Sequence, residues 1–79
     1  MKTIVRSFVQ GQVQDDGTIE VICQGRTIFS GDKAAALVLL GQMDPLMKQR
    51  GNFLYATNGV TLRSYDVKDT IRVLREVVK

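Results

Sequence analysis

Two turn dipeptides, each lying between runs of strand-forming residues, constrain the fold of this sequence more than any other feature. Asp16-Gly17 separates TIVRSFVQGQVQ from TIEVICQ, and Asn58-Gly59 separates FLYAT from VTLRSY. Both dipeptides suit the positive φ angles of a type I′ turn, which joins adjacent antiparallel strands. Gln24-Gly25 is a weaker third turn that would let RTIFS return beside TIEVIC. We therefore predict an N-terminal meander of three strands, followed later by a hairpin around Asn58.

Between these two strand regions the sequence changes to helix-forming residues. KAAALVLLGQM, residues 33–43, is rich in strong helix formers, and Asp32 or Ser30 is placed to accept from its first amide groups. Because this segment is apolar on all sides, we expect it to be deeply buried. Asp44-Pro45 predicts an N-cap and a restart as one or two further helical turns, and Gly51 predicts their end.

The last segment, DVKDTIRVLREVVK, has the spacing of an amphipathic helix. Asp66 is its predicted N-cap, and Asp69 is a variant of the acid in a capping box. Its apolar residues repeat every three or four positions, with Val73 and Val77 widening a stripe formed by Val67, Ile71, Leu74 and Val78. We expect this stripe to pack on a sheet.

The predicted elements follow the order βββα(α)ββα, with no internal repeat and no linker. Each helix has one main apolar surface to bury, so the simplest arrangement is an antiparallel sheet of about five strands with the helices on one face. We therefore predict an α+β fold, with residues 1–79 forming a single small domain.

Length and charge restrict the class of protein further. A chain of 79 residues buries only about 60% of its unfolded surface, so self-association would add stability. The single cysteine, Cys23, cannot form an internal disulfide, and the sequence contains neither a signal-peptide pattern nor an apolar run long enough for a membrane helix. We expect a cytoplasmic protein. Residues 1–46 carry four basic and five acidic side chains, and residues 47–79 carry seven and three, a distribution that suits either an anionic partner or solubility alone.

The sequence offers little material for catalysis. It has no histidine, which removes the commonest general base and the commonest zinc ligand. Cys23 alternates with Ile19 and Val21 and is expected to be a buried structural thiol. The segment GDKAAA lacks the spacing of a phosphate-binding loop. We therefore expect no enzymatic activity, no metal and no cofactor.

What remains is the surface of the sheet. If residues 6–14 form one strand, alternation places Arg6, Phe8 and Gln10 on one face, in a row continued by Gln12 and Gln14. The strand VTLRSYD places Thr61, Arg63 and Tyr65 on its polar face, and Lys48 and Arg50 lie in the preceding loop. We expect Phe8 to be covered by a partner subunit, by the chain's own terminal helix or by nucleic acid, in that order.

These residues support two hypotheses of different classes. The first is a non-enzymatic interaction or regulatory module that acts by protein–protein contact, as a homodimer or a subunit of a larger assembly. The alternative is a small basic protein that binds single-stranded DNA or RNA on the sheet face, where rings stack on bases and arginines meet phosphates. The surface residues for either hypothesis are Arg6, Phe8, Gln10, Lys48, Arg50, Arg63 and Tyr65.

Overall fold

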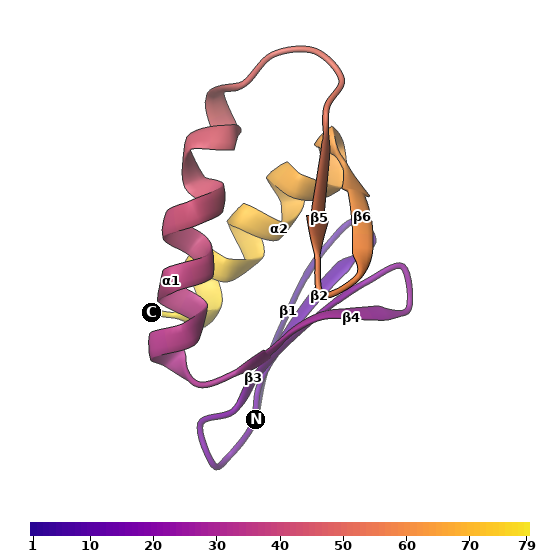
Figure 1. Ribbon diagram of the computed structural model, residues 1–79. Coiled ribbons are helices and arrows are strands. Elements are labelled where there is room, and N and C mark those ends of the chain that lie inside the picture. Colours follow the sequence, from indigo (N-terminus) through magenta and orange to yellow (C-terminus); the bar gives the residue numbers. More distant parts are fainter.

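The computed structural model describes residues 1–79 and confirms the α+β class and the predicted order of elements (Figure 1). It contains six strands rather than five. The strands are β1 (Lys2–Arg6), β2 (Val9–Val13), β3 (Ile19–Cys23), β4 (Arg26–Gly31), β5 (Leu54–Thr57) and β6 (Val60–Arg63). The helices are α1 (Lys33–Met43), the short 3-10 helix η1 (Asp44–Lys48) and α2 (Ser64–Val77).

The additional strand arises at Ser7 and Phe8. The segment predicted as one strand bends there, so that β1 returns antiparallel to β2 with Arg6 paired to Val9. Ser7 adopts a φ of 56°, a conformation that serine seldom takes, and Phe8 is not one of the usual turn formers. The strand prediction was wrong at this point because tertiary pairing overrides the weak local preference of Ser-Phe for an extended backbone.

The three predicted turns differ in geometry. Asn58-Gly59 has φ angles of 51° and 74°, and Gln24-Gly25 has 51° and 80°, as the two-residue hairpin turn requires. At Asp16-Gly17 only the glycine has a positive φ, so the hairpin is present but its loop is wider than predicted. There the Asp16 carboxylate accepts a hydrogen bond from the Thr18 amide at 2.9 Å, and this bond lowers the pKa of Asp16.

Helix α2 forms the centre of the molecule, with the four-stranded meander β1-β2-β3-β4 on one side and α1 on the other (Figure 1). The predicted stripe is confirmed, because Val67, Ile71, Val73 and Leu74 are fully buried and Val77 nearly so; Val78 lies beyond the helix end and is half-buried. The facing side of the sheet contributes small and β-branched residues, namely Val9, Gly11, Ile19 and Val21.

Helix α1 begins where predicted, since the Asp32 carboxylate accepts from the Ala35 amide at 2.8 Å. The prediction of deep burial on all sides was wrong. Only Ala36, Leu39 and Met43 are buried, whereas Leu37 and Val38 are 47% and 61% exposed. A single layer of neighbours can cover only one side of a helix, and in this chain no further element is available to cover the other.

The strands β5 and β6 form a separate two-stranded sheet rather than extending the meander. Their hairpin is attached to β4 through side chains. Thr57 donates to the Ile28 carbonyl at 3.3 Å, and Asn58 donates to the Thr27 carbonyl at 3.0 Å. Strand β4 lies at the edge of the meander, so carbonyl groups on its outer side have no strand partner and can accept these bonds.

Two predicted helix caps have other roles in the structure. Helix α2 starts at Ser64, so Asp66 lies inside its first turn, where it is 4% exposed and accepts from the Gln24 side chain at 3.0 Å. Asp44 is the first residue of η1 rather than its cap, and its carboxylate accepts from Arg75. Both carboxylates connect segments far apart in the sequence, an effect that local patterns cannot predict.

Candidate functional site

The residues predicted to share one face of a strand over residues 6–14 are separated by the Ser7–Phe8 turn. Because paired residues of antiparallel strands point to the same side, Arg6 lies on the same side as Val9, which is the side of α2. Gln10 lies on the opposite side. Phe8 is in the turn and is 69% exposed, so the chain's own terminal helix does not cover it.

The row of glutamines does face away from the helices. Gln10 and Gln12 pair with Ile22 and Glu20 of β3, and these side chains are half-buried among one another on the open side of the sheet. Gln14 follows the strand and donates to the Glu20 carboxylate. Their amides are thus part of a polar sheet surface, which antiparallel sheets commonly present to water.

The remaining predicted residues belong to other parts of the molecule. Arg63 ends β6, and Tyr65 lies in the first turn of α2 instead of on a strand. Lys48 ends η1, and Arg50 lies in the loop that follows it. Since β1 and β6 belong to different sheets, the structure does not join Arg6 and Phe8 to Arg63 and Tyr65 in one continuous sheet face.

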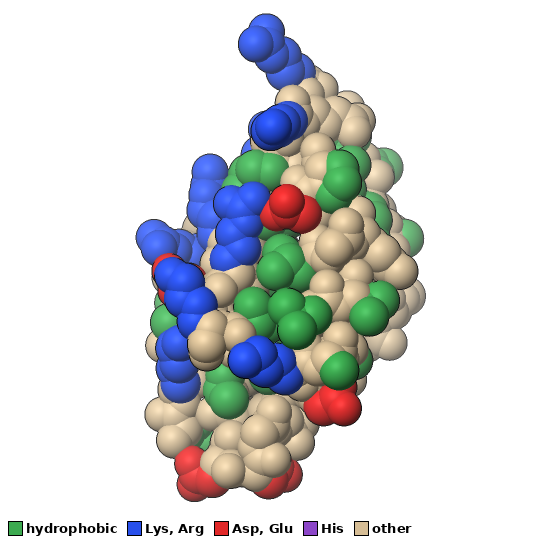
Figure 2. Space-filling view, turned by 90° about the vertical axis from the view of Figure 1, so that its left-hand side faces the viewer, with side chains coloured by type: hydrophobic (Ala, Val, Ile, Leu, Met, Phe, Trp, Pro, Cys, Tyr) green, Lys and Arg blue, Asp and Glu red, His purple; other side chains and the backbone are tan.

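The structure draws attention to two other surfaces, the first of which is the uncovered side of α1. Ala34, Leu37, Val38 and Gly41 are all exposed, and because the last three lie three, four and seven residues after the first, the four share one face of the helix. Figure 2 shows this side of the molecule, with hydrophobic side chains in its middle and Lys and Arg side chains along one margin. The sequence itself indicates this second apolar face, because a helix without a polar stripe has apolar side chains on both its packed side and its opposite side.

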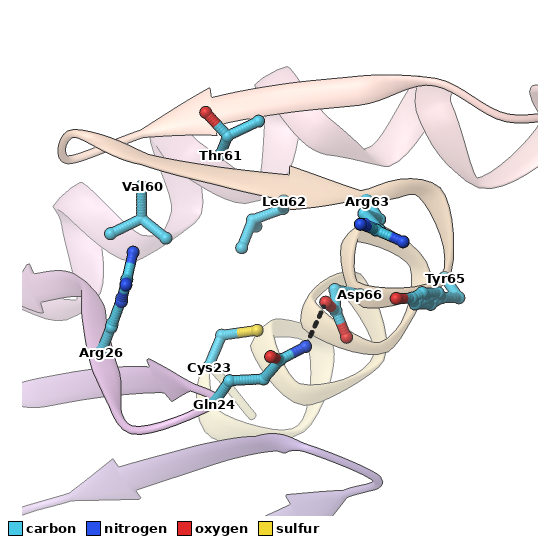
Figure 3. A pocket seen from close by; sticks show the side chains of 9 residues that line it. All are labelled: Cys23, Gln24, Arg26, Val60, Thr61, Leu62, Arg63, Tyr65 and Asp66. Carbon is cyan, nitrogen blue, oxygen red and sulfur yellow. Dashed lines mark hydrogen bonds between the residues drawn. The ribbon is translucent and has the colours of Figure 1, made fainter.

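The second surface is a cavity of about 500 Å³ between the β3–β4 turn, β6 and the start of α2 (Figure 3). Val60 and Leu62 of β6 and Cys23 of β3 supply its apolar lining. Arg26 and Arg63 supply positive charge, and the remaining polar lining comes from Gln24, Thr61, Tyr65 and Asp66. A smaller cavity of about 310 Å³ lies next to it and shares Arg63 and Tyr65.

Asp66 and Cys23 are the two buried titratable groups in the wall of this cavity. The Gln24 side chain donates to the Asp66 carboxylate at 3.0 Å, which connects the β3–β4 turn to the first turn of α2 (Figure 3). Cys23 is 2% exposed, and burial together with the neighbouring Asp66 charge raises its pKa to about 11. The thiol is therefore protonated at neutral pH, a state that disfavours nucleophilic chemistry.

The two arginines of the cavity differ from those of α2 in their partners. Arg72 pairs with Asp69 at 3.0 Å, and Arg75 pairs with Asp44. Neither Arg26 nor Arg63 forms an ion pair, and both residues are exposed. The cavity therefore carries two guanidinium groups whose charge no carboxylate of the chain neutralises in a direct contact.

No group of three or more histidine, cysteine, aspartate or glutamate side chains is arranged to hold a metal ion. None of the helices has the length and apolar character needed to cross a membrane. No protein-family model matches the sequence, and no curated protein or solved structure is significantly similar to it.

Proposed function

We propose that this protein is a non-enzymatic interaction module that self-associates through the exposed face of α1. The observation that carries the proposal is the apolar stripe Ala34, Leu37, Val38 and Gly41 on a face of α1 that no other element covers. Exposed apolar patches of this kind are typical of protein interfaces. A domain of 79 residues has a small core, so burying a second face by association adds stability that the monomer lacks.

The stripe is complementary to itself. In an antiparallel pair of α1 helices centred between Leu37 and Val38, Leu37 of each copy meets Val38 of the other. Ala34 of each copy then meets Gly41 of the other, and these small residues allow the helix backbones to approach closely. An interface of this kind is isologous, since both subunits use the same patch and the pair is closed.

The charges at the ends of α1 favour the same arrangement. Asp32 caps the N-terminal end of the helix, but the last turn has no basic residue, so the C-terminal end of the dipole is not compensated locally. Lys33 occupies the first position, where a cation is unfavourable. In the antiparallel pair, Lys33 lies next to the C-terminal turn of the second copy, where a cation is favourable.

The alternative is a protein that binds single-stranded nucleic acid. The excess of basic residues after residue 46 supports it. The nucleic-acid hypothesis is less well supported because Arg72, Arg75 and Lys79 form ion pairs with carboxylates of the same chain. Arg6 and Arg63, the two arginines of the predicted platform, also come from different sheets.

Sedimentation equilibrium of matched variants tests the proposal. Val38 and Val5 are each 61% exposed, but Val38 lies on the α1 face and Val5 on the outer strand β1. We expect the unmodified protein and Val5→Glu to sediment as dimers and Val38→Glu to sediment as a monomer. Gly41→Leu should also weaken the dimer, because the added side chain separates the helices.

Two results would contradict the α1 interface. One is a monomeric unmodified protein at all concentrations tested. The other is dissociation by Val5→Glu with Val38→Glu still dimeric, which would move the interface to the open sheet. A parallel titration with a single-stranded oligonucleotide at two salt concentrations addresses the alternative, since phosphate contacts make affinity fall steeply as salt rises.

A further inference from the structure

We propose that the cavity beside β6 binds a small organic dianion, in which two oxyanions, carboxylate or phosphate, are joined by an apolar body. The volume of about 500 Å³ lies within the range of small-molecule sites, roughly 300–1,000 Å³. None of its lining residues comes from α1, so the site does not depend on the proposed dimer.

The charges of the cavity lie toward its two ends. Arg63 is the last residue of β6 and Val60 the first. Asn58, two residues before Val60, donates to the carbonyl of Thr27 at 3.0 Å, and this bond places the neighbouring Arg26 toward the Val60 end (Figure 3). One guanidinium is therefore available near each end of the strand.

Between the two arginines both apolar and polar side chains line the cavity, and Leu62 and Cys23 are each only 2% exposed. Val60 and Leu62 project from β6 toward the β3–β4 turn, where Cys23 completes the lining (Figure 3). Tyr65 is 50% exposed and adds an aromatic ring beside Arg63. An apolar ligand body would contact Val60 and the Tyr65 ring, and its charged ends would meet the guanidiniums. Arginine is well suited to this role because its planar fork of donors matches the geometry of an oxyanion.

Asp66 does not cancel the positive charge of the site. Its side chain is 4% exposed and is held by the Gln24 hydrogen bond, whereas both arginines are exposed and make no ion pair. The lining has two positive groups and one negative group, so the cavity keeps an excess of positive charge. The start of α2 on the same wall contributes the positive end of a helix dipole.

The test compares ligands that share one body and differ in the number of charges. The probes are terephthalate and 1,4-phenylene bis(methyl phosphate), which each carry two negative charges at neutral pH, with benzoate as the ligand that has a single oxyanion. Each is titrated into ¹⁵N-labelled protein, and the backbone amide and arginine Nε–H signals are followed by NMR. We expect the shifts to concentrate at Gln24, Arg26, Thr61 and Tyr65. At least one dianion should bind about tenfold more tightly than benzoate, which corresponds to about 1.4 kcal/mol.

The variants show whether both arginines take part. Arg26→Gln and Arg63→Gln should each reduce the affinity for the dianion to that for benzoate. Arg50→Gln is the matched control, because it removes the same charge from an arginine outside the cavity, and it should change the affinity less than twofold. Val38→Glu should bind the dianion normally, which separates this site from the proposed dimer.

Three outcomes would overturn the dianion site. The first is equal affinity for benzoate and both dianions, and the second is the absence of shifts at the cavity with every probe. The third is an equal loss of affinity in Arg50→Gln, which would show a general effect of net charge. Preference for one of the two dianions would identify the oxyanion as carboxylate or phosphate and would support the site.

Discussion

Gly11 of β2 lies directly against Val73 of α2, so closely that a Cβ atom at residue 11 would overlap the Val73 side chain and come within 2.9 Å of Val77 Cγ1. This contact fixes the distance between the sheet and its central helix. The glycine has an ordinary extended backbone, so its role is steric and does not depend on a special φ angle.

We expect Gly11→Ala to destabilise the protein by about 1–3 kcal/mol, because an extra methyl group in a packed core forces neighbouring atoms to move. Gly41→Ala is the matched control. A Cβ atom at residue 41 meets nothing within 4 Å, and alanine is the better helix former by roughly 0.5–1 kcal/mol. Urea denaturation of both variants under monomeric conditions measures the difference. Equal stability of the two variants would contradict the close packing of α2 on β2.

Two large apolar side chains should respond differently to truncation. Leu74 is fully buried in α2, so Leu74→Ala should cost about 2–5 kcal/mol of unfolding free energy. Phe8 is 69% exposed in the β1–β2 turn, and Phe8→Ala should change the monomer's stability by less than about 0.5 kcal/mol. Denaturant midpoints measure both. A large loss for Phe8→Ala would mean that the β1–β2 turn packs on the core. A reduced dimer fraction would assign Phe8 to a partner contact.

The geometry of the Asn58-Gly59 turn predicts that adding a side chain at Gly59 destabilises the protein. Gly59 has a φ of 74°, and a β-branched residue there is strained, so Gly59→Val should lower the melting temperature. Thr61→Val is the suitable control, because Thr61 is exposed and makes no side-chain hydrogen bond to the chain. Thr57→Val is a poorer control, since Thr57 donates to the Ile28 carbonyl. An unchanged melting temperature in Gly59→Val would contradict the turn.

Because the pKa of Cys23 is raised, the stability of the fold should depend on pH in the alkaline range. The folded state raises the pKa of the thiol to about 11, whereas the ordinary pKa of a free thiol is 9.0. The folded state therefore binds the proton more tightly than the unfolded state. The resulting contribution to the free energy of unfolding is fully present below pH 9 and is lost as pH rises through 11. We expect stability to fall more between these values in the unmodified protein than in Cys23→Ala. Denaturation at several pH values measures the difference, and parallel curves for the two proteins would exclude a buried thiol.

Local patterns were sufficient for most of the secondary structure. The Asn-Gly and Gln-Gly turns, the Asp32 cap and the apolar spacing of α2 each depend on residues close together in the sequence. The α+β class follows from the same patterns. The Ser7–Phe8 turn was missed because its only unusual feature, the positive φ of Ser7, is imposed by the pairing of β1 with β2.

The candidate surfaces were much less accessible to prediction. The sequence placed Arg63 and Tyr65 on a strand shared with the meander, but the β5–β6 hairpin is held to β4 by the Asn58 side chain instead of by strand pairing. That bond joins the hairpin containing β6 to β4, and the contact of Gln24 with Asp66 lies in the wall of the cavity. Each joins residues more than 30 positions apart, so neither has a local signal.

By itself the sequence therefore determined which segments are strands and helices and which side of α2 is apolar, because these properties follow from the intrinsic periods of the backbone. Only the tertiary structure decided which apolar surfaces are covered. Helix α1 has apolar residues on every side, and its sequence does not distinguish Leu39, which is buried, from Val38, which is exposed. The number and position of neighbouring elements made that distinction, since burial depends on what packs against a residue as well as on the residue itself.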